Sequence, residues 1–167
     1  MPISHNAKLH KERGNVMDAK IDSNSLAKSA LEYAENFNGA VLSIDGSKYL
    51  KPIEQLIPAY VNQAFACELF LKSLLYHHEI DFPKTHNLKV LFDLLPEETQ
   101  NDAKTRFKRS EPNECLDKSL EDLGDAFQFA RYPHEKKGLA LSPTILRNFN
   151  IVIHKIAFEK IRVPTID

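Results

Sequence analysis

The sequence has only two cysteines, Cys67 and Cys115. Two cysteines cannot build the disulfide framework of a small secreted domain, and Cys67 lies in an apolar run, which suits a buried thiol in a reducing compartment. An excess of charge is missing too, because 22 basic and 23 acidic side chains give a formal net charge of -1. The chain as a whole is therefore not drawn to nucleic acid or anionic lipid, and any polyanion site must be a local patch.

Long hydrophobic runs are also absent. Residues 1–22 are polar and lack the apolar core of a signal peptide, and elsewhere charged residues interrupt each apolar run well before the length of a membrane span. We therefore expect a cytoplasmic protein without membrane contact. Residues 1–22 are predicted to form a polar N-terminal extension, and residues 23–167 a single domain long enough to bury a core without disulfides or metal.

Several familiar catalytic motifs do not occur in the sequence. It has no glycine-rich phosphate loop, no Cys-x-x-Cys pair and no Gly-x-Ser-x-Gly nucleophile turn. The seven histidines include the neighbours His77 and His78, but adjacent residues of a helix point about 100° apart and do not easily share one metal ion. The sequence thus predicts no metal site and no cofactor.

Helical periodicity is what the sequence does contain. Apolar residues recur at steps of three and four, breakers separate six such segments, and no convincing strand pair or repeat is present. We predict an all-α protein, an up-and-down helical bundle with four main helices and two shorter ones. The segments lie at about residues 23–38, 58–79, 85–95, 97–109, 113–132 and 143–162.

Cap and breaker residues set the expected ends of these helices. Asn38-Gly39 is predicted to end the first helix, and Pro58 to begin the longest one. Thr85 and Asn113 are the expected N-caps of the short third helix and of the fifth helix.

Glu68 is an acid inside the apolar stripe of the longest helix. It falls between Ala64 on the preceding turn and Leu71 on the following one, where a carboxylate is costly unless it is paired. Lys72, four residues further on, is a ready partner. Two interpretations stay open: an ordinary ion pair at the margin of the bundle, or part of a functional site.

Residues 130–135 read Ala-Arg-Tyr-Pro-His-Glu and form the sharpest local feature. Arg131 should leave its helix on the inward-facing side, and Pro133 fixes the chain so that His134 lies beside it. An arginine that binds phosphate and a histidine that moves a proton are a minimal set for phosphodiester chemistry. Alternatively, these residues close a helix, and Arg131 pairs with an acid such as Glu68.

Arg147 and His154 form a second pair in the last helix. They are seven residues apart and lie within about 20° of each other on the helical wheel, largely opposite the apolar arc. A solvated face is the favoured interpretation. Ile151 and Phe158 lie near this face and could make a subunit contact.

One basic cluster is suited to a nucleic-acid backbone. It lies in the polar fourth helix, where such a run of charge is often simply solvated. Its members are Lys104, Arg106, Lys108 and Arg109.

Three blocks of the sequence carry a resemblance to a known family. They are Ala66 to Leu75, Thr85-His86-Asn87-Leu88 and Arg131-Tyr132-Pro133, and they occur in the expected order. In these blocks the chain resembles the HEPN superfamily (higher eukaryotes and prokaryotes nucleotide-binding). The resemblance covers roughly two-thirds of the chain, and order and spacing carry more weight than any single block.

The resemblance implies an up-and-down helical bundle that is often a homodimer. Many members are metal-independent ribonucleases of toxin, phage-defence and RNA-processing systems, and others bind RNA or nucleotides without cleaving them. The nuclease members use an arginine followed after four to six residues by a histidine. Arg131 and His134 lie at the matching place with two residues between them, whereas Arg147 and His154 have the required spacing but lie in the following helix.

Two hypotheses follow from these features. In the first, a HEPN-like domain binds RNA or a nucleotide and cleaves RNA, with Arg131 on phosphate, His134 as acid and base, and Glu68, Lys72 and Tyr132 in support. In the second, the chain is a non-catalytic interaction module that acts through dimerisation or through an antitoxin-type protein partner.

Overall fold

The computed structural model describes residues 22–45, 52–124 and 142–162. Within these residues the chain is all-α, with four long helices, two short ones and no strand, which confirms the predicted fold class. None of the described helices is long and apolar enough to span a bilayer. The helices are α1 (Ser23–Asp45), α2 (Pro52–His77), α3 (Leu88–Asp93), α4 (Glu97–Ser110), α5 (Leu116–Leu123) and α7 (Pro143–Arg162).

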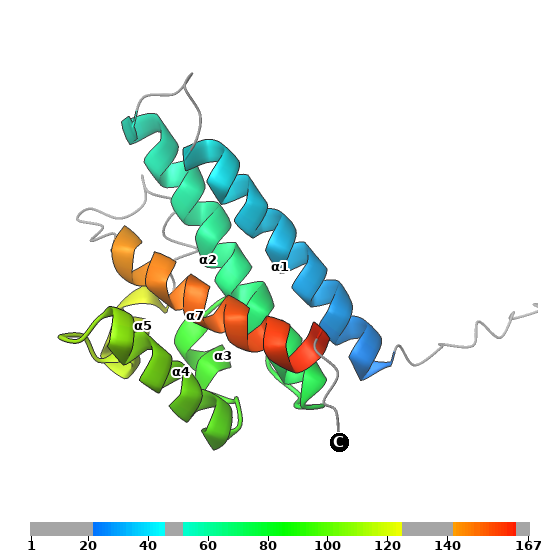
Figure 1. Ribbon diagram of the computed structural model, residues 1–167. Helices are drawn as coiled ribbons and strands as arrows, with labels where there is room; N and C mark the ends of the chain where they lie inside the picture. Colours follow the sequence, from blue (N-terminus) through cyan, green and yellow to red (C-terminus); the bar gives the residue numbers. More distant parts are fainter. Residues whose placement is uncertain (1–21, 46–51, 125–141, 163–167) are drawn as a thin grey trace, which may run out of the picture.

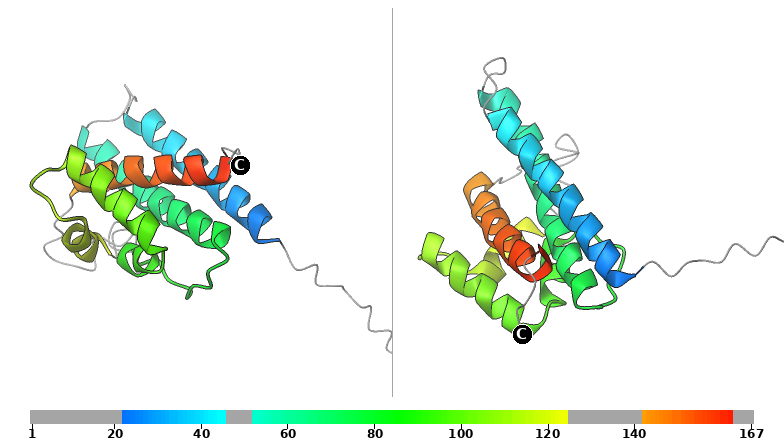
Figure 2. Two further views of the ribbon diagram at one scale, coloured as in Figure 1. Left: turned by 60° about the horizontal axis from the view of Figure 1, so that its bottom comes forward. Right: turned by 45° about the vertical axis from the view of Figure 1, so that its right-hand side comes forward.

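The last helix, α7, lies between two groups of helices. On one side α1 and α2 run along each other, and on the other side lie α4 and α5, with α3 at the end of α2 (Figures 1 and 2). Phe70 of α2 and Phe149 and Ile153 of α7 are fully buried where the groups meet. Cys67 is fully buried as expected, and burial raises the pKa of its thiol to about 12.

The first helix is longer than predicted. Asn38-Gly39 does not end α1, which continues to Asp45. Its apolar stripe also continues, because Ala34 and Val41 are both buried. Glycine costs about 1 kcal/mol inside a helix, and burial of the next turn against α2 offsets that cost.

The long helix begins earlier than predicted. Pro52, and not Pro58, takes the first helical position, and Pro58 lies inside α2. A proline there removes one backbone hydrogen bond. The packing of α1 along this part of α2 offsets the loss (Figure 1).

At the start of two helices the N-cap is a different residue from the predicted one. Asn87, and not Thr85, is the N-cap of α3, because its side-chain oxygen accepts a hydrogen bond from the Val90 N–H at 3.0 Å. The N-cap of α5 is Cys115 and not Asn113, and no side-chain hydrogen bond closes that end.

Candidate functional site

Glu68 lies in the middle of α2 and is almost completely buried, with 1% of its side chain exposed. Its neighbours Cys67 and Leu71 are fully buried, so the carboxylate has little access to water. Lys72 donates a hydrogen bond from Nζ to Oε1 at 2.6 Å, which is the ion pair that the spacing predicts. A buried carboxylate of this kind is tolerated because it is paired.

His86 is a second partner of Glu68. It belongs to the stretch between α2 and α3, and its Nδ1 lies 3.0 Å from both carboxylate oxygens. We refer to Glu68, Lys72 and His86 as the Glu68 cluster. His86 belongs to one of the sequence blocks that resemble the family, but it was not among the predicted site residues. A second partner could have been expected, because a buried carboxylate accepts more hydrogen bonds than one lysine donates.

The chemistry of the carboxylate sets the direction of the hydrogen bond between His86 and Glu68. An ionised carboxylate only accepts hydrogen bonds, so Nδ1 of His86 must carry the proton that Glu68 receives. The other ring nitrogen, Nε2, points away from Glu68, because the two ring nitrogens face different directions. In this arrangement Glu68 holds the orientation of the imidazole ring.

Backbone and cap contacts hold the chain on both sides of His86. Glu79 ends α2 in a left-handed conformation with φ 55°, and the next N–H, that of Ile80, donates to the Leu75 carbonyl at 2.9 Å. Beyond the turn, Thr85 accepts a hydrogen bond from the Asn87 N–H at 3.1 Å. His86 is therefore placed by the end of α2 and the start of α3.

Gly124 brings the end of α5 to the same corner. Its carbonyl accepts a hydrogen bond from the Leu88 N–H at 2.8 Å, and a Cβ at this position would lie 2.7 Å from Nδ2 of Asn87. The site residues Arg131, Tyr132 and His134 follow Gly124 along the chain and lie outside the described residues.

A pocket of about 610 Å³ opens beside the Glu68 cluster. Lys72 and His86 belong to its lining, and an aromatic pair, Tyr76 and Phe82, meets edge to face with ring centroids 5.0 Å apart. Nζ of Lys72 lies 6.0 Å from the centre of the Phe82 ring, a cation–π distance. The pocket thus combines fixed polar groups with flat apolar surface. The remaining lining residues are Ser23, Leu26, Glu79, Ile80, Asp81, Pro83, Lys84 and Thr85.

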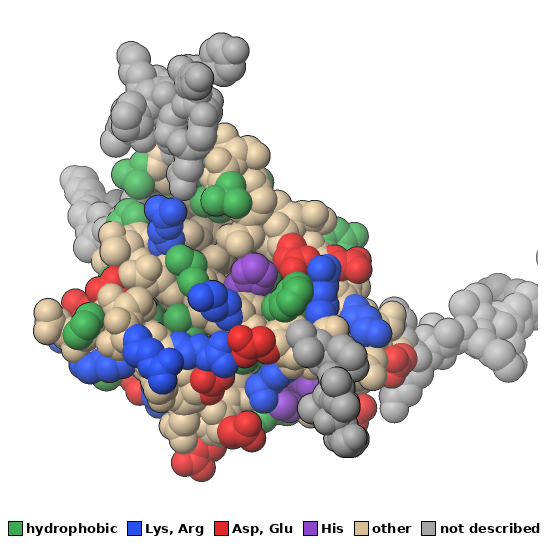
Figure 3. Space-filling view, in the orientation of Figure 1, with side chains coloured by type: hydrophobic (Ala, Val, Ile, Leu, Met, Phe, Trp, Pro, Cys, Tyr) green, Lys and Arg blue, Asp and Glu red, His purple; other side chains and the backbone are tan. Residues whose placement is uncertain are grey.

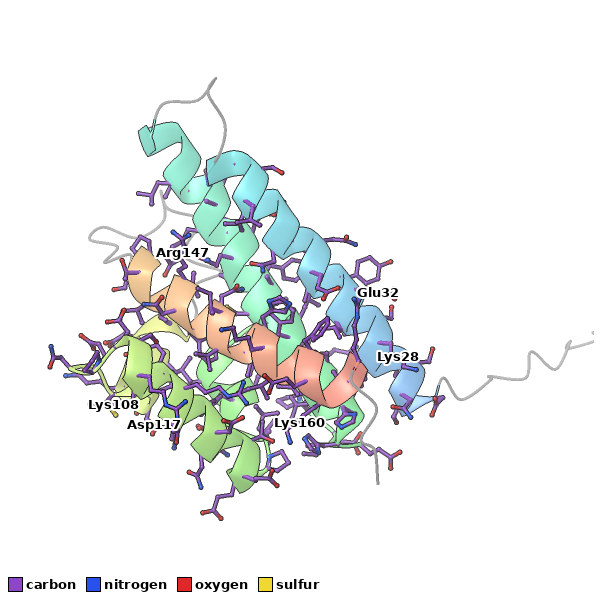
Figure 4. The ribbon with its side chains drawn as sticks, viewed as in Figure 1. Lys28, Glu32, Lys108, Asp117, Arg147 and Lys160 are labelled. Atoms are coloured by element: carbon purple, nitrogen blue, oxygen red, sulfur yellow. The ribbon has the colours of Figure 1, made fainter. Side chains whose placement is uncertain are left out.

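The second candidate pair is not brought together in the described chain. Arg147 is exposed near the start of α7, as expected for a solvated face (Figure 4). His154 lies about 10 Å further along the helix axis. Its ring is partly buried and stacks on Phe70 with centroids 4.9 Å apart, so the solvated-face expectation is wrong for this residue.

The predicted basic cluster of α4 is partly neutralised. Lys104 pairs with Asp117 at 2.9 Å. Arg106 pairs with Asp102 and with Glu159, and these acids raise the pKa of the guanidinium above its ordinary value. Lys108 and Arg109 are exposed and have no ion pair within the described residues. Figure 3 shows lysine and arginine side chains in a band over α4 and α7, with acidic side chains among them.

His77 is the last residue of α2, and His78 follows it in the turn. Their rings lie 5.1 Å apart, and burial is the main cause that lowers the pKa of each. Within the described ranges, no three His, Cys, Asp or Glu side chains come close enough together to hold a metal ion.

Comparison with known families matches this arrangement to one of them. The family model of the HEPN domain matches residues 59–151, which is more than half of the chain and includes the whole Glu68 cluster. Comparisons with curated proteins and with solved structures gave no match. The extent of the family match shows that this chain belongs to the HEPN domain family.

Proposed function

We propose that this HEPN domain binds RNA at the pocket beside the Glu68 cluster and cleaves it without a metal ion. Arg131 would bind the phosphate and His134 would move a proton, as the resemblance to the nuclease members implies. The observation that carries the proposal is the buried Glu68, which holds Lys72 and His86 at the wall of a pocket.

The pocket offers what a nucleotide unit of RNA needs. Lys72 supplies a cation for the phosphate, and Tyr76 and Phe82 supply aromatic surface for a base. The chain that leads to Arg131 starts at Gly124, whose carbonyl accepts a hydrogen bond from the Leu88 N–H, two residues after His86. Six residues lie between Gly124 and Arg131, and a fully extended chain of that length spans roughly 20 Å.

The exposed cations Lys108 and Arg109 are proposed to hold the RNA backbone beyond this pocket. Lys104 and Arg106 would contribute less, because acids already neutralise them. We place the activity in the cytoplasm, where RNA is available and thiols stay reduced.

The test is RNA binding and cleavage by the purified protein in the presence of a chelator. We expect cyclic-phosphate ends, weaker binding by Arg131→Ala, and loss of cleavage with retained binding in His134→Ala. Arg147→Ala and His154→Ala test the second pair in the same assay. Lys28→Ala, which removes one exposed cation from α1 (Figure 4), is the control for a general loss of charge. If Arg131→Ala and His134→Ala match the wild type, this site assignment is wrong.

A non-catalytic interaction module is the second candidate function. Ile151 and Phe158 are apolar residues of α7 with 44% and 39% of their surface exposed. This pair favours a protein contact, which we propose is a homodimer. In a toxin–antitoxin system, the same face would be available to the antitoxin.

A further inference from the structure

We propose that the groove between α4 and α7 is a separate binding site for the phosphate backbone of RNA, in which Arg109 and Lys155 hold the phosphate. The groove has a volume of about 600 Å³, and its lining shares no residue with the pocket beside the Glu68 cluster. The inference rests on the proposed function for the identity of the ligand. It adds a second site, on the other side of α4 from α5, with α7 as one of its walls.

Two contacts tie α4 to α7 along this groove. Arg106 donates hydrogen bonds from its two terminal nitrogens to the carboxylate of Glu159, at 2.9 and 2.7 Å. Five residues further along α4, Glu111 accepts a hydrogen bond from Asn148, which lies near the start of α7. The two helices are therefore antiparallel here, and hydrogen bonds between their side chains fix the walls of the groove.

The acids that line the groove already have a partner. Asp102 accepts a hydrogen bond from Nε of Arg106 at 2.8 Å, and Glu159 is bound by the other nitrogens of the same guanidinium. These hydrogen bonds are the main cause that lowers the pKa of Glu159, so its carboxylate is ionised at neutral pH. Arg106 thus holds both acids, and neither of them pairs with the remaining cations of the groove.

Arg109 of α4 and Lys155 of α7 are those remaining cations. Both side chains are exposed, both line the groove, and neither makes an ion pair with another residue in the described parts of the chain. Two positive charges on facing helices repel each other, and an anion bound between them removes that repulsion. A phosphate suits the pair, because a guanidinium donates two parallel hydrogen bonds to it and an ammonium adds a compact charge.

The cations continue beyond the groove on both helices, which favours a polymer of phosphates over a single anion. Lys108 precedes Arg109 on α4, and Arg147 lies eight residues before Lys155 on α7, about 12 Å along the helix axis (Figures 3 and 4). No aromatic side chain lines the groove, so it offers no surface on which a base could stack. We therefore expect contacts to the backbone alone, which do not depend on the RNA sequence.

The first test is RNA affinity as a function of salt, measured with a 2′-O-methyl oligouridylate of about 20 nucleotides, which lacks the 2′-hydroxyl needed for cleavage. The double variant Arg109→Gln, Lys155→Gln should bind at least about tenfold more weakly at about 50 mM salt. Its slope of log K against log salt should be shallower by about 1.4, because each phosphate contact with a single strand contributes about 0.7. The control Lys28→Gln, Lys118→Gln removes two exposed cations from α1 and α5 and should change the slope by less than about 0.3.

The second test looks for a gain of binding. Glu159→Gln keeps an oxygen that accepts from Arg106 but removes one negative charge from the groove. RNA affinity should rise by about threefold at low salt, since the groove then carries a larger excess of positive charge. Glu32→Gln is the matched control, because it removes an exposed acid from α1 (Figure 4) and alters the net charge of the protein equally. Equal affinities of these two variants would overturn the role of the groove.

The third test uses poly-L-glutamate of the same length and separates this inference from the proposed function. If it binds as tightly as the RNA and needs Arg109 and Lys155, the ligand is an acidic polypeptide and the RNA assignment is wrong. RNA binding that the double variant retains within about twofold at each salt concentration refutes the groove alone. Loss of binding in the double variant but not in Arg131→Ala supports the groove and refutes the pocket assignment. Absence of RNA binding by the wild type refutes both proposals.

Discussion

His86 and His154 both lie beside a glutamate, one at the corner between α2 and α3 and the other on α7. Nδ1 of His86 lies 3.0 Å from both oxygens of Glu68, whereas Nε2 of His154 lies 3.7 Å from Oε1 of Glu35. Stacking on Phe70 holds the His154 ring instead. The two histidines thus differ in what fixes them, a carboxylate in one case and an aromatic ring in the other.

Burial of the acid accounts for the difference. Glu68 is 1% exposed and is therefore shielded from water. Protein groups must donate the hydrogen bonds that water would otherwise supply to its carboxylate. Glu35 is 26% exposed and already accepts a hydrogen bond from Arg162 at 2.7 Å. Because Glu35 is partly exposed and is already paired with Arg162, it does not require a hydrogen bond from His154. At the corner between α2 and α3 a buried acid therefore holds a histidine ring in place.

The largest expected effect comes from removing a single partner of the buried acid. Lys72→Met should lower the free energy of unfolding by about 3 kcal/mol, because it leaves Glu68 buried with one partner fewer. In a Glu68→Leu background the same change should cost less than about 1 kcal/mol, since no charge is left behind. Urea unfolding of the two single variants and the double variant measures the coupling.

Arg162→Met is the matched change at the other histidine, because it removes the partner of Glu35. It should cost less than about 1 kcal/mol, since that pair is partly exposed. Equal costs for Lys72→Met in both backgrounds would show that burial does not set the strength of the Glu68 cluster, and the comparison would fail.

The second expected effect comes from the close packing of Gly124 against the Asn87 side chain, at the corner between α2 and α3. A methyl group in Gly124→Ala would lie 2.7 Å from Nδ2 of Asn87, whose side chain caps α3 next to His86. We expect a loss of about 1–3 kcal/mol in stability, because either the cap or the end of α5 must move. Gly39→Ala is the control, since the added Cβ meets nothing within 4 Å, and it should stabilise α1 by about 0.5–1 kcal/mol. Similar thermal melts for the two variants would contradict this account.

The helices could be predicted from the sequence because their apolar stripes are one-sided. Leu88, Leu91 and Phe92 are all buried, and α3 lies where their spacing places it. The end of α1 could not be predicted in this way. Asn38-Gly39 is a strong local signal to stop, and only the neighbouring α2 shows that Val41 has a place to be buried.

The candidate site was accessible to sequence analysis only in part. The pair of Glu68 and Lys72 follows from helical spacing, because residues four apart are neighbours on one face. His86 is 18 residues from Glu68, and the turn after α2 brings the two together. No short-range pattern in the sequence indicates that two residues this far apart in the chain are in contact. The ion pairs of Lys104 with Asp117 and of Arg106 with Glu159 were likewise out of reach, since they join different helices.

The third effect concerns the apolar residues of α7 and should be small for the folded chain. Ile151→Ser and Phe158→Ser should each lower the free energy of unfolding of a monomer by no more than about 1 kcal/mol, because 44% and 39% of their surfaces are exposed. If α7 forms the proposed homodimer, sedimentation should show a dimer for the wild type and a 19.1 kDa monomer for the double variant. A wild-type monomer at micromolar concentration would contradict the dimer.

The smallest expected effect is the change of stability with pH that is caused by two partly buried histidines, His77 and His78. Burial is the main cause that lowers the pKa of His77 and of His78, and the charge of Lys160 adds to it. The folded state therefore binds protons less readily than the unfolded chain, whose imidazoles titrate near 6.5. The stability that these neutral rings contribute is present above that pH and is lost as the pH falls through the lowered values. The wild type should lose more thermal stability between pH 7.5 and pH 5.5 than the double variant His77→Gln, His78→Gln. If the wild type and the double variant lose the same thermal stability over this pH range, folding does not hold either ring in its neutral form.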